Sequence, residues 1–209
     1  MKVNEYTYRE LTSKNKIGSL VYEKDLKYDL SDEKVNVLFS VEDGSVNDVK
    51  IEEEFDKYYK KVIYLTSKSK DNTSFILFGN EKDIQYYENH RDCKDFLVND
   101  IKLLNESNKI LLARNGQNQE LLSDLVSDRS NTIPTNDVVV IIRQLENFDI
   151  PSFDMLLTVS RSRKIYYIIE IEDAQKFNNK YTPEVLEIIK AHSKLFYVVG
   201  EEGKLEIKY

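Results

Sequence analysis

Short apolar runs alternate with helical patterns from residue 74 to the end of the chain. The runs that predict strands are residues 74–78, 109–113, 138–142, 165–171 and 195–199. The segments with helical spacing between them are residues 82–104, with a break around Asn89, then 119–126, 152–160 and 183–191. Pro183 after Thr182 is typical of a first helical turn behind its cap. Residues 205–208, after Gly203, predict a last antiparallel edge strand.

This alternation predicts the fold class. Strands that alternate with helices of about ten or more residues need right-handed crossovers, and these build a three-layer α/β domain around a mostly parallel sheet. Residues 138–142 are apolar at every position, so we expect this strand to be central and buried on both faces. Whatever follows it lies at the carboxyl edge of the sheet, where open α/β folds bind their ligands.

The first seventy residues are less regular. Residues 5–11 are ambiguous, 35–41 alternate weakly as a strand, 52–61 suggest a short helix, and 62–65 are β-like. Glu42-Asp43-Gly44-Ser45 is a turn signal. We therefore expect residues 1–70 to form a small lead-in packed on a main domain of residues 71–209. A lead-in without a core of its own favours a domain excised from the C-terminal end of a longer protein.

Composition and charge exclude several classes. The chain has 209 residues, 41% hydrophobic, and a net charge of −7, which argues against a general nucleic-acid sleeve. No apolar run approaches the ~20 residues of a membrane span, and the N-terminus has no signal-peptide core, so we expect a cytoplasmic segment. Any membrane anchor would belong to the parent protein.

Neither the cysteine nor the histidines suggest a reactive centre. The single cysteine, Cys93, lies in a charged helical stretch and cannot form a disulfide framework within the chain. His90 and His192 are far apart in sequence without ligand spacing, so we expect no metal site and no histidine-based catalytic triad.

Residues 74–200 resemble the motor fold of the FtsK/SpoIIIE translocases and conjugative coupling proteins of the HerA/FtsK superfamily. The resemblance rests on the order of elements and on short phrases: IP at 150–151, SRSR at 160–163 and IKAH at 189–192. It implies a P-loop-like domain of the RecA/FtsK type. In that alignment the strand ending at Gly79 leads into the phosphate loop, and residues 138–142 are the Walker B strand.

The chain departs from the family pattern at each nucleotide-binding position. After Gly79 it has Asn80, Glu81, Lys82 and Asp83 in place of a glycine-rich loop, and carboxylates there repel a triphosphate. The Walker B strand ends in Arg143 and Gln144 instead of a metal-binding aspartate and a glutamate, and Glu172 stands at the polar sensor position. Because phosphoryl transfer depends on positioning and charge neutralisation, we expect no catalytic residue, no bound nucleotide cofactor and no enzymatic activity in the isolated domain.

Within this superfamily the chain is most similar to the degenerate C-terminal module of the type VII secretion ATPases, EssC and EccC. That resemblance implies a parent ATPase with adjacent motor modules and a role in recognising secreted WXG-type proteins. Two alternatives stay open: a degenerate module of a conjugative DNA-transfer coupling protein, or an ATPase that still binds nucleotide through a non-standard loop.

Two groups of charged residues are further candidates. We expect Arg143 to form an ion pair with Glu170 or Glu172 of the neighbouring strand, in the place where a live motor keeps magnesium. Arg161 and Arg163 lie between a helix and a strand and could face an acidic partner or DNA, although a charged loop explains them equally well.

Overall fold

The computed structural model describes residues 4–7, 36–41, 51–68, 72–114, 120–199 and 204–208. The described strands form one nine-stranded sheet with the order β1-β9-β8-β2-β7-β6-β3-β5-β4. The strands are β1 Asn4–Thr7, β2 Asn36–Val41, β3 Thr73–Phe78, β4 Leu97–Val98, β5 Ile110–Ala113, β6 Asp137–Ile142, β7 Ile165–Ile171, β8 Ser193–Val199 and β9 Lys204–Lys208. All neighbours from β8 to β4 pair in parallel, whereas β9 pairs antiparallel with both β8 and β1.

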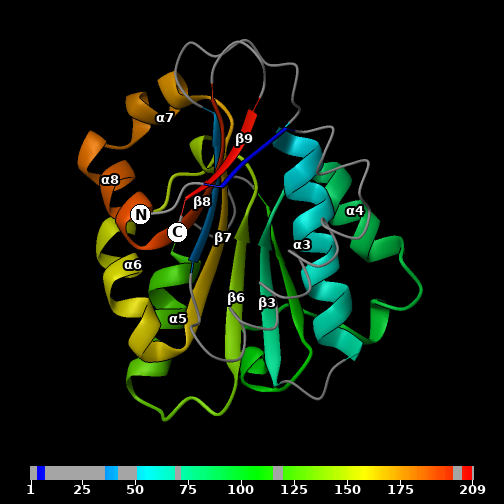
Figure 1. The fold of residues 1–209 in the computed structure, drawn as a ribbon. Coiled ribbons are helices and arrows are strands. Elements are labelled where there is room, and N and C mark those ends of the chain that lie inside the picture. The colour runs from blue at the N-terminus through cyan, green and yellow to red at the C-terminus, as the bar shows by residue number, and fades with distance from the viewer. Residues whose placement is uncertain are drawn as a thin grey trace.

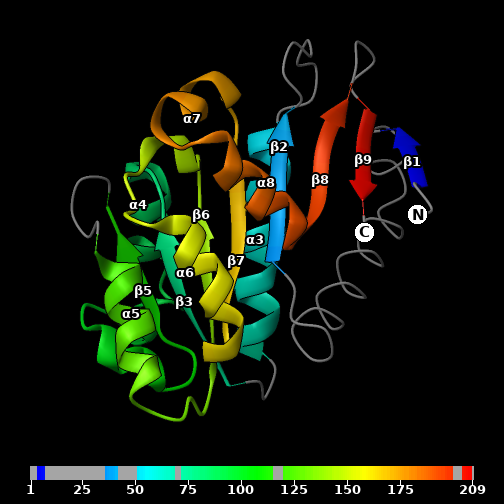
Figure 2. The same cartoon turned by 90° about the vertical axis from the view of Figure 1, so that its left-hand side faces the viewer.

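Helices cover both faces of this sheet (Figures 1 and 2). Their bounds are α3 Ile51–Lys68, α4 Glu81–Asn89, α5 Leu121–Ser130, α6 Phe153–Ser160, α7 Ala174–Lys180 and α8 Pro183–Ala191. Short 3-10 segments join them: η2 Lys94–Phe96, η3 Ile101–Asn105, η4 Leu145–Asn147 and η5 Arg161–Arg163. Helices α3 and α4 lie on one face, and the remaining helices lie on the other (Figure 1). The predicted three-layer α/β class is confirmed.

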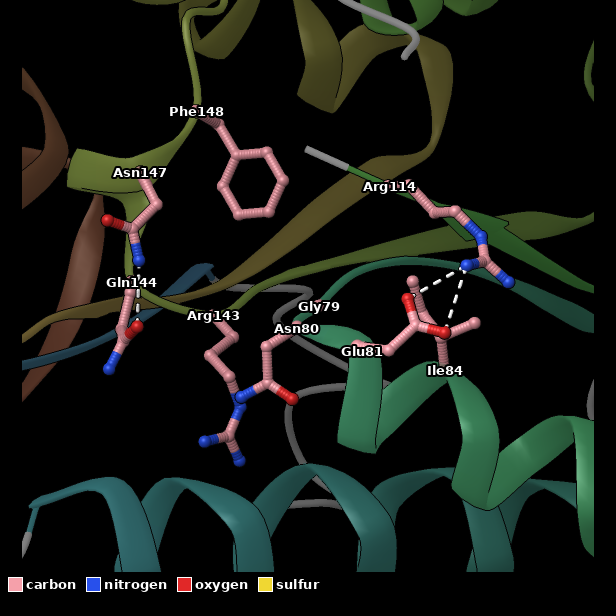
Figure 3. Close-up of a pocket in the computed structure, with 9 residues that line it drawn as sticks. All are labelled: Gly79, Asn80, Glu81, Ile84, Arg114, Arg143, Gln144, Asn147 and Phe148. Carbon is pink, nitrogen blue, oxygen red and sulfur yellow. Dashed lines mark hydrogen bonds and ion pairs between the residues drawn. The ribbon is translucent and has the colours of Figure 1, made fainter. Parts of the chain in front are cut away.

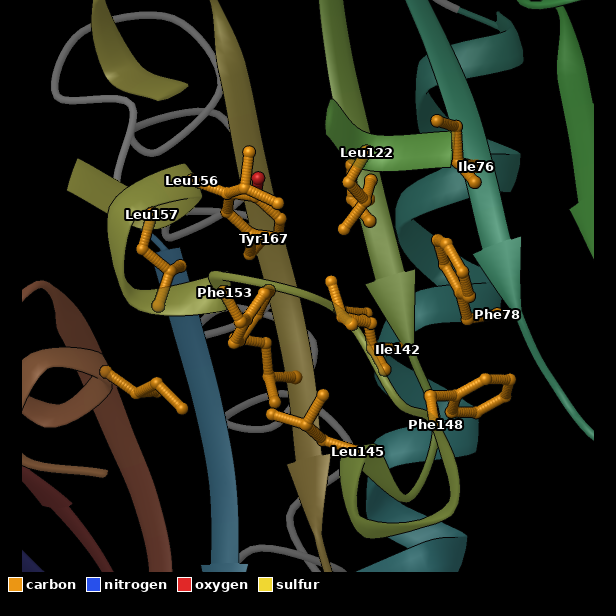
Figure 4. Close-up of a cluster of buried hydrophobic side chains, with 14 of the residues drawn as sticks. Ile76, Phe78, Leu122, Ile142, Leu145, Phe148, Phe153, Leu156, Leu157 and Tyr167 are labelled. Atoms are coloured by element: carbon orange, nitrogen blue, oxygen red, sulfur yellow. The ribbon is translucent and has the colours of Figure 1, made fainter. Parts of the chain in front are cut away.

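The core consists of two apolar layers, one on each face of the sheet. The larger layer joins β6 and β7 to α5, α6, α7 and α8, as with Phe153 and Tyr167, whose rings meet edge to face at 5.7 Å (Figure 4). The smaller layer packs Phe55, Tyr58 and Tyr59 of α3 against Phe39 of β2. Successive residues of β6 enter opposite layers, and Val138–Ile142 are all buried. The prediction that this strand is covered on both faces is therefore confirmed.

The expected lead-in of residues 1–70 is corrected by the sheet. Strand β2 lies inside it, between β8 and β7, and α3 covers the same face as α4. These elements belong to the same layered domain as β3 to β8. The weak alternation of residues 35–41 gave no sign of this, because the pairing partners of β2 lie more than a hundred residues further along the chain.

Helix α3 is longer than predicted and includes residues 62–65, which the sequence suggested as β-like. The buried residues of α3 recur at positions 51, 55, 58, 59, 62 and 63. This is the stripe of a helix that buries one face. The β-branched pair Val62 and Ile63 obscured the pattern, because such residues also favour strands.

The helix expected over residues 82–104 ends early, and one helix was missed. Helix α4 stops at Asn89, where His90 takes an extended backbone conformation, and η2, β4 and η3 follow. Helix α7 has the polar sequence AQKFNNK with one buried side chain, Phe177, so it shows little periodicity. Other predicted elements are confirmed: β7 and α8 have their expected bounds, and β3, β5, β6, α6, β8 and β9 differ by one or two residues.

A buried arginine forms hydrogen bonds at the amino edge of the sheet. Arg129 of α5 is 1% exposed and donates to the backbone oxygens of Asn136, at 2.9 Å, and Arg163, at 3.1 Å. It also donates to the side-chain oxygen of Asn136 at 2.8 Å. The guanidinium thereby satisfies carbonyls where β6 and β7 begin, which buried backbone groups require. No helix in the described part of the chain is long and apolar enough to cross a membrane.

Candidate functional site at the carboxyl edge

A cavity of about 380 Å³ opens where β3, β5 and β6 end. Its wall includes Gly79 and Asn80 after β3, Arg114 after β5, and Gln144 and Phe148 after β6 (Figure 3). The strands that follow β3 in the chain lie on both sides of it, since β5 pairs with one side and β6 with the other. Such a switch point at the carboxyl edge is the usual place for a ligand in a parallel α/β sheet.

The link from β3 to α4 is too short and too well capped to hold a phosphate. Only Gly79 and Asn80 lie between the strand and the helix. The side chain of Asn80 accepts from the backbone nitrogens of Lys82, at 2.9 Å, and Asp83, at 3.1 Å. Asp83 returns a bond by accepting from the backbone nitrogen of Asn80 at 3.1 Å. This capping box occupies amides that a phosphate would need.

Gly79 is required by the close approach of Asp83. A Cβ at position 79 would lie 3.0 Å from the Cβ of Asp83. The glycine therefore makes room for the capping carboxylate. Its presence after the strand resembled the start of a phosphate loop only in sequence.

Arg143 extends from the end of β6 into a group of three carboxylates. Its side chain is 2% exposed and points toward α3 (Figure 3). Nη1 lies 2.8 Å from Glu52 Oε1, Nε lies 2.7 Å from Asp83 Oδ2, and Nη2 contacts Asp56 Oδ1. The contacts of Nε and Nη2 are ion pairs by distance but lack hydrogen-bond alignment. One guanidinium thus ties β6 to both α3 and α4.

Tyr59 completes this group from α3. Its hydroxyl donates to Asp83 Oδ1 at 3.0 Å, in a buried position. Burial raises the pKa of Asp83, whereas the bonds from Tyr59 and from the backbone of Asn80 favour its ionised form. Burial, and next the charge of Asp83, also raise the pKa of Tyr59, so this hydroxyl stays a donor.

Hydrogen bonds connect the turn after Arg143 to the end of β7, and in each of them a carboxyl oxygen accepts from a nitrogen. The backbone nitrogen of Gln144 donates to Glu170 Oε2 at 3.2 Å. In return, Glu146 Oε1 accepts from the backbone nitrogens of Glu172, at 3.1 Å, and Asp173, at 2.9 Å. Gln144 has φ 50° and ψ 67°, a left-handed conformation uncommon for a residue with a side chain. The side-chain nitrogen of Gln144 also donates to Glu172.

The expected ion pair of Arg143 with Glu170 or Glu172 is therefore wrong. Among the residues that the structure describes, Arg143 pairs with carboxylates of α3 and α4, and Gln144 bonds Glu170 of β7 and Glu172 just after it. Arg143 lies on the face of the sheet that α3 and α4 cover (Figure 1), so its side chain meets the carboxylates of these helices. The expectation could not include Glu52 and Asp56, because it assigned their helix to a separate lead-in.

The structure brings some of the predicted site residues together and separates others. Gly79, Asn80, Arg143 and Gln144 line the cavity, but Lys82 and Glu172 do not. Lys82 is exposed on the first turn of α4. The second predicted group, Arg161 and Arg163, lies in η5 just before β7, so it is at the amino edge, opposite the cavity. There Arg163 Nε donates to Ser130 Oγ at 3.0 Å.

Comparison with known proteins supports the fold. The sequence matches no protein-family model and no curated protein. The structure is similar to that of the genome packaging NTPase B204 from Sulfolobus turreted icosahedral virus 2 in complex with AMP, with a TM-score of 0.51 and 12% identity over 80% of this chain and 77% of that chain. The sulfate and ATP-gammaS complexes of the same NTPase give TM-scores of 0.48 at 11% and 10% identity, over 80% and 79% of this chain and 76% of theirs.

This likeness extends into the first seventy residues, since residues 71–209 alone could not supply 80% of the chain. Strand β2 lies inside the sheet between β7 and β8, whereas β3 lies between β5 and β6.

The sequence after β2 retains part of a phosphate-loop pattern. Residues 44–51 read GSVNDVKI, which places Gly44 and Lys50 at the spacing of GxxxxGK[ST]. Val49 replaces the second glycine, and Ile51, the first residue of α3, replaces the hydroxyl that would bind magnesium. Residues 42–50 lie outside the described part of the chain. The spacing could have been found in the sequence, but residues 42–45 were interpreted there as a simple turn.

Arg143 connects the end of β6 to the start of α3. Its guanidinium reaches Glu52 and Asp56 on the first two turns of α3. A fixed cation on a side chain thus lies between these two elements. The chain has an α/β fold similar to that of a P-loop NTPase.

Proposed function

We propose that this chain is an ATPase-like module that does not hydrolyse nucleotide and serves as an interaction domain of a secretion motor of the type VII kind. The observation that carries the first half is Arg143, buried among Glu52, Asp56 and Asp83. A guanidinium cannot coordinate magnesium, and it already pairs with the carboxylates that could. The loss of a hydroxyl at position 51 and of a glycine at position 49 acts in the same direction.

The second half rests on the resemblance of the sequence to a secretion module. The phrases of that resemblance lie just before α6, at the end of α6 together with η5, and at the end of α8 with the residue that follows it. A module that has lost its chemistry can still offer a binding surface, because a fold does not fix one function. We therefore propose WXG-type secreted proteins and the neighbouring motor modules as its partners.

The first prediction is that Mg-ATP does not bind detectably to the 209-residue chain. A ligand at one hundred times its Kd adds about 2.7 kcal/mol of stability, which a thermal-shift titration would register. We expect no shift at millimolar Mg-ATP. If a shift does occur, Lys50→Ala and Lys82→Ala separate the two loops. Loss of the shift in the first variant alone would establish nucleotide binding after β2 and contradict the proposal.

A second function is favoured by one observation, the retained Gly44 and Lys50. A lysine and a glycine at this spacing can still contact phosphates, so the module could bind a nucleotide as a structural ligand without cleaving it. The same titration decides between the two functions, because this one requires a shift that magnesium does not strengthen. A coupling module for DNA transfer gains support only from the packaging NTPase named above, and the net charge of −7 is against it.

The second prediction concerns partners. We expect the 209-residue chain to retain helical secreted substrates from its own secretion locus in a pull-down at low salt. Such substrates bind by apolar residues at i, i+3 or i+4, and i+7 laid into a groove. A substrate with those anchors replaced by serine is the matched control and should be lost. Failure to retain any intact substrate would contradict the interaction role while leaving the prediction on Mg-ATP untouched.

A further inference from the structure

Arg143 and Glu170 are neighbours on adjacent strands, although they are not paired. Ile142 of β6 is opposite Ile169 of β7, so the next residue on each strand lies beside the other on the face that α3 covers. Glu170 is 0% exposed. Its Oε2 accepts from the backbone nitrogen of Gln144, but its Oε1 is buried without a hydrogen-bond partner. An unpartnered buried carboxyl oxygen next to a guanidinium requires an explanation.

The charges that face Glu170 come from each element packed against it. Arg143 lies at the end of β6, Glu146 in η4, Glu172 just after β7, and Tyr59 on α3, while β2 presents the uncharged Phe39. Burial raises the pKa of Glu170 most, Arg143 lowers it, and Glu172 and Glu146 raise it, to about 8. The carboxyl group is therefore neutral in mildly acidic solution and charged in mildly alkaline solution.

The two states of Glu170 place different demands on Arg143. When Glu170 is neutral, the guanidinium is balanced by the carboxylates of Glu52, Asp56 and Asp83. When Glu170 is ionised, a buried charge with a bare oxygen lies beside the same guanidinium, and such a charge is costly unless it is paired. The guanidinium of Arg143 is the cation beside this charge, and to pair with it Nε would have to leave Asp83 or Nη2 would have to leave Asp56.

We propose that Arg143 is a proton-linked switch: it holds α3 and α4 while Glu170 is protonated, and turns to Glu170 when that carboxyl group ionises. The exchange would release Asp83 and Glu52 and so loosen the start of α4 and the first turn of α3 from the sheet. The proton on Glu170 of β7 would therefore control how firmly α3, which begins directly after residues 42–50, is held to the sheet. The switch operates on Arg143 and its carboxylates whether or not the module binds nucleotide.

Nuclear magnetic resonance of the 209-residue chain tests this switch. The signals are the carboxyl carbon of Glu170 and the side-chain Nε–H of Arg143, followed from about pH 6 to about pH 10 across the expected transition. We expect both to change with one shared midpoint near 8, the pKa of Glu170. Glu170→Gln should abolish the change at Arg143. A carboxyl carbon that titrates while the Arg143 signal stays fixed would contradict the exchange.

Glu172→Gln is the second variant, in case position 170 tolerates no substitution. Glu172 raises the pKa of Glu170 by like-charge repulsion, so its removal should lower the midpoint. Both signals should move to the new midpoint together. A midpoint that moves for Glu170 alone would also overturn the proposal.

Discussion

Replacing Arg143 with methionine should destabilise the domain by about 3 kcal/mol, the lower end of the range for breaking a buried ion pair. The side chain of Asp83 is 5% exposed and would lose its nearest cation. Glu52 and Asp56, whose side chains are 47% and 28% exposed, can turn toward water, which reduces the loss of stability. Urea unfolding of the variant and the wild type at the same pH measures the difference, with the slope of the transition unchanged.

Arg114→Met is the matched control for this variant. Arg114 also lies beside the cavity and pairs with two carboxylates, Glu81 at 2.8 Å and Glu88 at 3.1 Å. Those pairs are exposed to solvent, so their loss should leave the urea midpoint close to that of the wild type. Equal losses from the two variants would show that burial gives Arg143 no special role. Arg143→Asp should destabilise the domain as well and should not create ATP hydrolysis.

The stability of the domain should fall as pH rises from about 5 to about 8, and Glu170 should account for a few kcal/mol of that fall. The pKa of Glu170 is about 8 in the folded chain, against 4.5 for an ordinary glutamate. Between these values the folded state binds the proton and the unfolded state does not. The contribution is therefore complete below about pH 4.5 and is lost progressively as pH approaches 8.

Glu170→Gln isolates this contribution, because glutamine keeps the acceptor for Gln144 and cannot ionise. The two proteins should have similar free energies of unfolding near pH 5, and the variant should be the more stable near pH 8. Burial also raises the pKa of Asp83 and Glu146, so the variant should keep a smaller slope of the same sign. A constant difference between variant and wild type across this range would show that Glu170 is ionised throughout.

Local patterns were enough to predict the layers of the domain. Buried strands such as β6 and β7 are mostly apolar runs, and Thr182 and Pro183 mark the start of α8 in the sequence itself. The position of β2 depends instead on pairing with β7 and β8, far along the chain, and no local pattern carries that information. The mistaken boundary near residue 70 followed from this.

The sequence singled out Arg143 but did not predict the residues that it contacts. The sequence identified Arg143 as the replacement for a metal ligand, and the structure places it at the end of the strand expected. Its carboxylates come from α3 and α4, and only the assembled sheet brings these helices over β6. The same error hid the spacing of Gly44 and Lys50, because a phosphate loop was sought only after β3.

The central claim is that Arg143 fills the cation position of an ATPase-like site. An experimental structure of crystals grown with Mn²⁺ and a non-hydrolysable ATP analogue near pH 6 tests it most directly, because manganese is identified by its anomalous scattering. The account predicts the guanidinium in contact with Glu52, Asp56 and Asp83, and no manganese among these carboxylates. A manganese ion bound to them, with Arg143 turned away and the nucleotide phosphates beside the metal, would contradict it.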